Sequence, residues 1–401
     1  MRQGSLTDRF QSPGVLVGAC ALAYLPFTLL GYGTDIDAAN VLRAGRSWLD
    51  DGHYHLSRGP GAAIQEVATA ALDKIGGSVL VNLVAVGFAA LALWAVQALV
   101  HHDGGPHPRG ALLMLATSPW FWIAATSLAD FVWALALVLA GAVAAQRDRR
   151  WLAGLLFGLA IGCRASSVLL VMAWLVAERG GGSRERVGWR PIAMTGLVAV
   201  MVGVACFVPP WLDAGRTMSF LHNELAFEGV RVHLGRWLVK NVAVIGVPAG
   251  LVLLVGIGPL ARVISRWRAS TVVRFALISL VLSEALFFRL PFKPLHLLPV
   301  VACLALLVGM STDVRRRWLV VLVVAQLIGG LIGTTLAAPD VQDAAQSGSL
   351  ELGVRAGPLL TDVRCRLDDR ARGPWPVAAS AAATRRAAVN ADCQNQAWRA
   401  H

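Results

Sequence analysis

Two aspartates beside an apolar segment are the residues of this sequence best placed to do chemistry. Asp35 and Asp37 follow directly after a long apolar run that begins at Pro13. Carboxylates this close to a lipid boundary are energetically costly and tend to mark function, and a carboxylate can take a proton from a hydroxyl nucleophile. Aspartate is also a favourable residue at the start of a helix. The sequence leaves both roles open.

The segment after the two aspartates has the spacing of a surface helix. Apolar residues recur at helical intervals over 38–49 and include Trp48, which suits a membrane interface. Thr34 and Asp37 also have the spacing of a capping pair. We therefore expect an amphipathic helix in a first outer loop, 34–77, lying along the membrane surface.

Basic side chains in other parts of the chain could hold a phosphate, because phosphate oxygens bind strongly to arginine and lysine. Arg58 directly precedes a Gly-Pro-Gly turn, and Arg289 and Lys293 flank a turn at Pro291. The other candidates for the same site are Arg231, His296, Asp130 and Arg164.

Each of these residues also has a purely structural interpretation. Arg289 and Lys293 could extend their charges from a helix end into water. His296 could be a histidine satisfied at a helix end. Arg164 could donate hydrogen bonds to carbonyls between two short apolar runs, and Asp130 could lie at a helix N-terminus or orient Arg164. The sequence does not decide between these roles.

The composition indicates which elements must carry the candidates. Of the 401 residues, 56% are hydrophobic and 15% are charged, whereas a soluble domain has roughly a quarter of charged residues. Lipid accepts such an apolar surface, but it requires backbone polar groups to be satisfied within helices or a closed barrel. The apolar runs are continuous rather than alternating, so they predict an all-α polytopic bundle of about eleven spans.

The arginines indicate the orientation of these runs. The runs lie approximately at 13–33, 78–100, 110–126, 128–146, 151–163, 165–178, 191–210, 241–261, 271–288, 294–310 and 318–338. The arginine-rich loops are those around 109, 147–150, 179–190, 262–268 and 315–317. These loops alternate with the others if the N-terminus is cytoplasmic, as the positive-inside rule requires. The net charge of +12 therefore reflects topology and not nucleic-acid binding.

The chain divides into a membrane domain and a tail. Residues 1–338 form the predicted transmembrane domain, with outer loops at 34–77 and 211–240, and residues 339–401 form a non-cytoplasmic tail. Cys365 and Cys393 in this tail could pair if that face is oxidising. The bias toward Ala and Arg is typical of a high-GC bacterium, so we expect the bacterial inner membrane.

Several motifs occur in an order that resembles the GT-C superfamily, whose multi-spanning glycosyltransferases use polyprenyl-phosphate-linked sugars. The motifs are Asp51-Gly52-His53-Tyr54, Ser57-Arg58-Gly59-Pro60-Gly61 with Glu66, Ser118-Pro119-Trp120, Ser127-Leu128-Ala129-Asp130, Cys163-Arg164 and Arg289-Leu290-Pro291-Phe292-Lys293-Pro294-Leu295-His296. They resemble the mannosyltransferase or aminoarabinose transferase type. Together they cover most of residues 13–310.

The resemblance implies an inverting transfer of a sugar from a polyprenyl-phosphate carrier to a glycan, lipid or protein acceptor. Spacing to Gly52 matches Asp37 to the catalytic carboxylate, with Asp35 assisting or holding a divalent metal. The basic candidates would hold the phosphate. The chain departs from the family where Asp-Ile-Asp replaces the common Asp-Glu, and where His296 replaces a tyrosine.

Three other functions remain open. A transporter or flippase of lipid-linked glycans is disfavoured because no repeat is evident and central charges are scarce, with Glu284 close to an outer end. A non-catalytic membrane scaffold would use the tail to bind partners. A ligase that transfers whole glycans would usually need a large late outer loop, and the turn at Pro291 is short.

Overall fold

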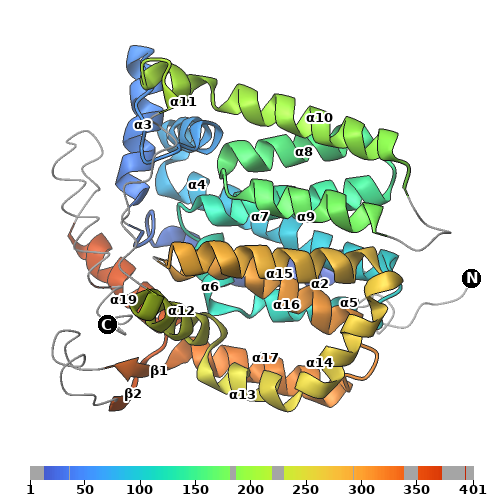
Figure 1. Ribbon diagram of the computed structural model, residues 1–401. Helices are drawn as coiled ribbons and strands as arrows, with labels where there is room; N and C mark the ends of the chain where they lie inside the picture. The colour runs from blue at the N-terminus through green and yellow to red at the C-terminus, as the bar shows by residue number, and fades with distance from the viewer. Residues whose placement is uncertain are drawn as a thin grey trace, which may run out of the picture.

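Helices make up most of the protein in the computed structural model, which describes residues 13–35, 37–180, 187–218, 230–291, 293–337, 351–372 and 393 (Figure 1). In chain order the elements are α2 (Pro13–Tyr24), η1 (Leu25–Leu29), α3 (Asp37–Asp51), α4 (Ala63–His102), α5 (Pro108–Ala116), α6 (Pro119–Ala125), α7 (Asp130–Gln146), α8 (Arg150–Cys163), α9 (Ser167–Arg179), α10 (Trp189–Cys206), α11 (Val208–Asp213), α12 (Val230–Ile245), α13 (Val247–Val255), α14 (Ile257–Val263), η3 (Ile264–Arg268), α15 (Thr271–Arg289), η4 (Pro294–Leu297), α16 (Leu298–Met310), α17 (Arg316–Leu331), β1 (Ile332–Ala337), β2 (Glu351–Ala356) and α19 (Pro358–Ala371). The all-α prediction is confirmed, apart from one antiparallel hairpin of β1 and β2.

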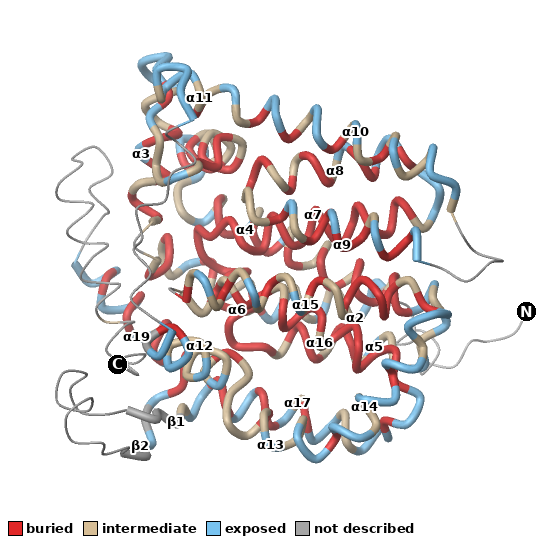
Figure 2. Tube along the Cα trace, viewed as in Figure 1, coloured by how far each residue is buried: buried red, intermediate tan, exposed pale blue. Residues whose placement is uncertain are grey.

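The long helices lie side by side across the molecule and share one apolar core (Figures 1 and 2). Helix α7 lies at the centre, and its residues 130–145 are all buried. Helix α10 lies at the edge and leaves Leu197, Met201 and Val204 at least 61% exposed. An apolar surface of this kind is suited to contact with lipid.

Helix α8 packs against α10 through a row of glycines. A Cβ atom on Gly158 would lie 2.4 Å from the Val202 Cβ, and such atoms on Gly154 and Gly162 would lie 2.6 Å and 2.5 Å from α10. Small residues spaced four apart let two helix backbones approach closely within a membrane. The glycines therefore explain why this pair of helices is so tightly packed.

Helices cover most of each apolar run, but the first run leaves helix after Leu29, where η1 ends. By length and apolar composition, α4, α10 and α15 can each cross a membrane alone. Two bent pairs, α6 with α7 and residues 233–245 of α12 with α13, raise this count to five within the described parts of the chain. The other expected spans are shorter or broken helices, and the predicted run 318–338 ends as helix at Leu331, where β1 begins.

The predicted surface helix is present as α3. Ala38, Val41 and Leu42 are buried against Val81 and Leu128, so the apolar face faces the bundle as the spacing predicts. The following helix, α4, is kinked at Gly76 and Gly77, the latter with φ of +60°. The part of α4 before the kink packs beside α3, and the part after it is the predicted second span.

The loops gather at two opposite ends of the bundle. At one end, which we call the arginine end, Arg266 donates to the Met310 carbonyl at 2.7 Å and Arg274 donates to the Ala177 carbonyl at 2.7 Å. Helices α3, α11 and α19 and the hairpin lie at the other end, the site end (Figure 1). The two sets of loops are thus segregated as the arginine pattern predicts. Which end faces the cytoplasm stays a prediction.

Candidate active site

The two first-loop aspartates share one lysine from the late turn. Lys293 Nζ lies 2.6 Å from Asp35 Oδ1 and 2.7 Å from Asp37 Oδ2. Asp35 Oδ1 also accepts the backbone N–H of Asp37 at 2.9 Å, where α3 begins. The structural and the charge-pairing roles of this acidic pair therefore coexist.

These contacts continue into a chain of alternating charges. Arg58 bridges Asp37 Oδ2 at 2.6 Å and Asp130 Oδ2 at 2.7 Å, and Arg164 also binds Asp130 Oδ2, at 2.9 Å. In order, this charge chain runs Asp35, Lys293, Asp37, Arg58, Asp130 and Arg164. Three carboxylates and three cations from distant segments thus neutralise one another.

Buried Glu66 holds the loop that carries Arg58. Its carboxylate accepts hydrogen bonds from the hydroxyls of Tyr54 and Ser57, and Glu66 is 0% exposed. The neighbouring helix α3 fits closely here, since a Cβ on Gly45 would lie 2.1 Å from the Glu66 carbonyl oxygen. In the sequence Glu66 stands out only as part of a motif, and nothing there predicts its anchoring role.

The neighbouring charges keep the key groups ionised. Burial alone would raise the pKa of Asp37, but Lys293 and Arg58 outweigh it and hold this pKa below its usual value. Burial would lower the pKa of Lys293, but Asp35 and Asp37 outweigh it and raise that pKa. Both groups are therefore charged at neutral pH.

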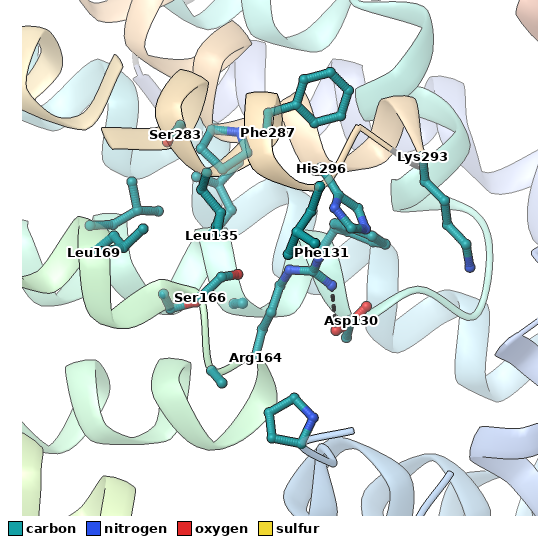
Figure 3. A pocket seen from close by; sticks show the side chains of 18 of the residues that line it. Asp130, Phe131, Leu135, Arg164, Ser166, Leu169, Ser283, Phe287, Lys293 and His296 are labelled. Atoms are coloured by element: carbon teal, nitrogen blue, oxygen red, sulfur yellow. Dashed lines mark hydrogen bonds and ion pairs between the residues drawn. The ribbon is translucent and has the colours of Figure 1, made fainter. Parts of the chain in front are cut away.

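A cavity of about 390 Å³ lies against the charge chain. Its charged lining comes from Asp37, Arg58, Asp130, Arg164 and Lys293, and His296 also lines it. Figure 3 shows apolar and small side chains, including Leu135 and Leu169, on the side away from Lys293 and Asp130. The cavity therefore combines an ionic region with an apolar region.

Aromatic rings separate these two regions. The Arg164 guanidinium lies 3.8 Å from the centre of the Phe131 ring, a cation–π geometry. The His296 ring lies 5.3 Å from the Phe131 ring and 6.5 Å from the Phe287 ring, measured between centroids. His296 thus stands between the charges and the apolar wall (Figure 3).

The structure brings most, but not all, of the predicted site residues together. Asp35 joins the charge chain without lining the cavity. Arg289 and Arg231 lie exposed outside the cavity, at the end of α15 and the start of α12. The lining residues of α15, Ser283, Leu286 and Phe287, follow one face of the helix. Arg289, the last residue of α15, is off this face.

The described residues offer no ready-made metal site. No group of three or more histidine, cysteine, aspartate or glutamate side chains comes together in these parts of the chain. Asp35 and Asp37, the pair considered for a divalent ion, both bind the Lys293 ammonium. The acidic pair therefore already shares one cation of the protein itself.

Comparison with known proteins establishes the fold. No known protein family and no curated protein matches the chain. Two crystal structures of ArnT from Cupriavidus metallidurans do match, each over 96% of this chain. The apo structure is 15% identical, with a TM-score of 0.57 and 76% of its own length covered. The structure bound to undecaprenyl phosphate is 14% identical, with a TM-score of 0.58 and 77% covered. The chain therefore has the polytopic helical membrane fold of these structures.

Proposed function

We propose that this protein is a membrane glycosyltransferase that moves a sugar from a polyprenyl-phosphate carrier to an acceptor hydroxyl on the outer face of the membrane. The observation that carries this proposal is the charge chain beside an apolar-lined cavity. A polyprenyl-phosphate sugar has an anionic group, a polar sugar and an apolar tail, and the cavity offers a matching surface to each. The ArnT crystal structure that shares this fold contains undecaprenyl phosphate, and this supports the same class of ligand here.

In this mechanism Asp37 is the general base. Its Oδ2 takes the proton of the acceptor hydroxyl as the acceptor oxygen forms a bond to the anomeric carbon of the sugar. The bond between that carbon and the carrier phosphate oxygen breaks, and the phosphate leaves with the electron pair. One displacement of this kind inverts the anomeric carbon. Lys293 and Arg58 stabilise the charge that grows on the leaving phosphate.

Donor binding would activate the base. In the free protein Asp37 is bound to Lys293 and Arg58, which weakens it as a proton acceptor. A donor phosphate competes for the same two cations. When they turn toward the phosphate, the pKa of Asp37 rises toward its ordinary value and its carboxylate is released for the acceptor. The order of binding is therefore donor first and acceptor second.

His296 and Arg164 complete the phosphate side of the site. His296 lines the cavity. The family that the motifs resemble has tyrosine at this position, and histidine, like tyrosine, can donate a hydrogen bond. Arg164 supplies a further positive charge, held in place by Asp130.

Binding of undecaprenyl phosphate to the purified protein in lipid nanodiscs tests the ligand class. We expect saturable binding that weakens at least about tenfold, or 1.4 kcal/mol, in Lys293→Met and Arg58→Met. Lys74→Met is the matched control, because Lys74 pairs with exposed Asp50 away from the cavity. Equal affinity in all four proteins, or no binding, would contradict the proposal.

A second assay separates transfer from transport. Polyprenyl-phosphate sugars incubated with the protein in detergent should lose their sugar to an added acceptor, and Asp37→Asn should stop this reaction without unfolding the protein. A flippase would leave the donor chemically intact. A scaffold would neither bind nor convert it.

A further inference from the structure

Helix α19 reaches the first outer loop one residue before its aspartates. The Thr34 hydroxyl donates to Asp362 Oδ1 at 2.8 Å, and Thr34 directly precedes Asp35. Both Thr34 and Asp362 are only 2% exposed. A residue 328 positions further along the chain therefore fixes the backbone at the entry to the site.

The same helix also holds the segment that leads to Asp130. Arg366 forms an ion pair with Asp362 through its Nε, at 2.9 Å, and its Nη1 donates to the Thr126 carbonyl at 3.0 Å. Thr126 lies four residues before Asp130. One buried ion pair on α19 thus contacts the chain next to two of the carboxylates of the charge chain.

The two contacted segments also touch each other beneath Arg366. The Leu128 N–H donates to the Tyr32 carbonyl at 2.9 Å. Gly33 has φ of +98°, and a Cβ there would lie 2.5 Å from the Ser127 Cβ and 3.5 Å from Arg366 Nη2. The approach leaves no room for a side chain, so a small movement of α19 is transmitted to both segments.

Attachment of α19 to the bundle would not by itself require a buried ion pair between Asp362 and Arg366. Asp362 and Arg366 are 2% and 1% exposed, and a buried ion pair is retained at a cost in desolvation that apolar residues would not incur. Its hydrogen bonds go to the site-bearing segments. Such directed polar contacts fix geometry in a way that apolar packing does not.

We infer that α19 is a positioning element for the active site: Asp362 and Arg366 hold Thr34 and Thr126, and thereby set where Asp37 and Asp130 stand. This inference rests on the proposed function for its effect on turnover, while the contact itself can be tested without any activity. Asp362, Arg366 and Thr34 act as positioning residues and do not touch the substrate.

Hydrogen exchange of the first loop tests the contact directly. Thr34→Val keeps the side-chain shape and removes the hydroxyl, whereas Thr34→Ser keeps the hydroxyl. We expect backbone amides at the start of α3 to exchange at least about fivefold faster in Thr34→Val and Asp362→Asn, with α9 and α16 unchanged. Thr34→Ser should behave like the wild type, as should Asp368→Asn, which alters an exposed residue of the same helix.

Steady-state kinetics test the consequence. Misplacement of the base weakens the transition state, so kcat should fall at least about tenfold in Thr34→Val and Asp362→Asn. The donor KM should change less than about threefold, because Glu66 anchors the loop of Arg58 through Ser57 and Lys293 lies at the start of η4, so neither cation depends on α19 alone. Recovery of kcat in Thr34→Ser would show that the hydroxyl is responsible.

Each of the two measurements can fail independently of the other. Unchanged exchange in both Thr34→Val and Asp362→Asn overturns the inference, as does faster exchange with an unchanged kcat. If the wild type transfers no sugar, the proposed function fails, and the exchange data alone then decide whether α19 holds the loop.

Discussion

Lys293 and Asp37 are separated by 256 positions in the sequence, yet the lysine Nζ lies 2.7 Å from Asp37 Oδ2. This contact joins the loop 34–77 to the turn at Pro291 and makes one site of two motifs that lie far apart in the sequence. It also means that Asp37, the strongest candidate for the base, stays paired with Lys293 and Arg58 until another anion binds these two cations. Such ion pairs have consequences for pH dependence and stability that can be measured.

The pH dependence of donor use should report the pairing of Asp37. Because Lys293 and Arg58 hold its pKa below the ordinary 3.8, Asp37 is ionised throughout the usual range, and kcat/KM for the donor should stay flat down to about pH 4. A depressed carboxyl pKa stabilises the fold above the pKa of the unfolded state, and this contribution is lost only as pH falls through the folded value. Lys293→Met should move the acid limb to higher pH. An unmoved limb in this variant would show that Lys293 does not govern Asp37.

Asp130 should be essential for stability because it is buried between two guanidinium groups. It is 3% exposed and pairs with both Arg58 and Arg164. Asp130→Asn leaves two cations without their shared partner and should destabilise the protein by about 3–5 kcal/mol, measured by thermal unfolding in detergent. The control is Asp313→Asn, which removes an ion pair to 70% exposed Arg262 and should cost about 0–1 kcal/mol. Similar losses in both variants would argue against the charge chain.

The glycine row of α8 gives a packing prediction that is independent of function. A Cβ on Gly158 would meet the Val202 Cβ at 2.4 Å, whereas nothing lies within 4 Å of such an atom on Gly87 of α4. Gly158→Ala should therefore cost about 1–3 kcal/mol through overpacking. Gly87→Ala should be neutral or stabilise α4 by up to about 1 kcal/mol. Thermal unfolding of the two variants under the same conditions compares them, and equal midpoints would contradict the close contact.

Part of the site could be predicted from the sequence because charged residues are scarce in this chain, so the few that lie near apolar segments are conspicuous. Asp37 and Lys293 stand out because each lies beside an apolar run, and Arg58 stands out because it directly precedes a Gly-Pro-Gly turn. Buried charges must find opposite partners. Helix periodicity likewise placed the buried face of α3, since Ala38 and Val41 are buried as expected. These features follow from local sequence and from elementary electrostatics.

Other features depend on tertiary contacts that leave no local signal. The hydrogen bond from Thr34 to Asp362 exists because α19 packs on the first loop, and no sequence pattern in the tail predicts this packing. Arg289 lies near Lys293 in the sequence, but it is on a different face of α15 from the residues that line the cavity. The strand β1 continues an apolar run, and hydrophobicity alone does not separate a strand from the end of a helix. Pairing with β2 decides the outcome.

The tail disulfide provides a test of both topology and tail structure. Cys365 and Cys393 are joined, while Cys20, Cys163, Cys206 and Cys303 are free thiols. A disulfide persists where the compartment is oxidising, so protein isolated without reductant should show two fewer alkylated cysteines than the reduced protein. Cys393→Ser should remove this difference and leave the other four thiols unchanged.

The same bond should stabilise α19, because it closes a loop with a sequence separation of 28 residues. Loss of such a link costs about 3–4 kcal/mol in local stability. Proteolysis near α19 should therefore accelerate in Cys393→Ser and in reduced wild type, and Cys20→Ser is the control, since Cys20 lies in α2. If both tail cysteines are free thiols in protein isolated without reductant, the site end does not face the oxidising side, and the outward assignment of the first loop fails with it.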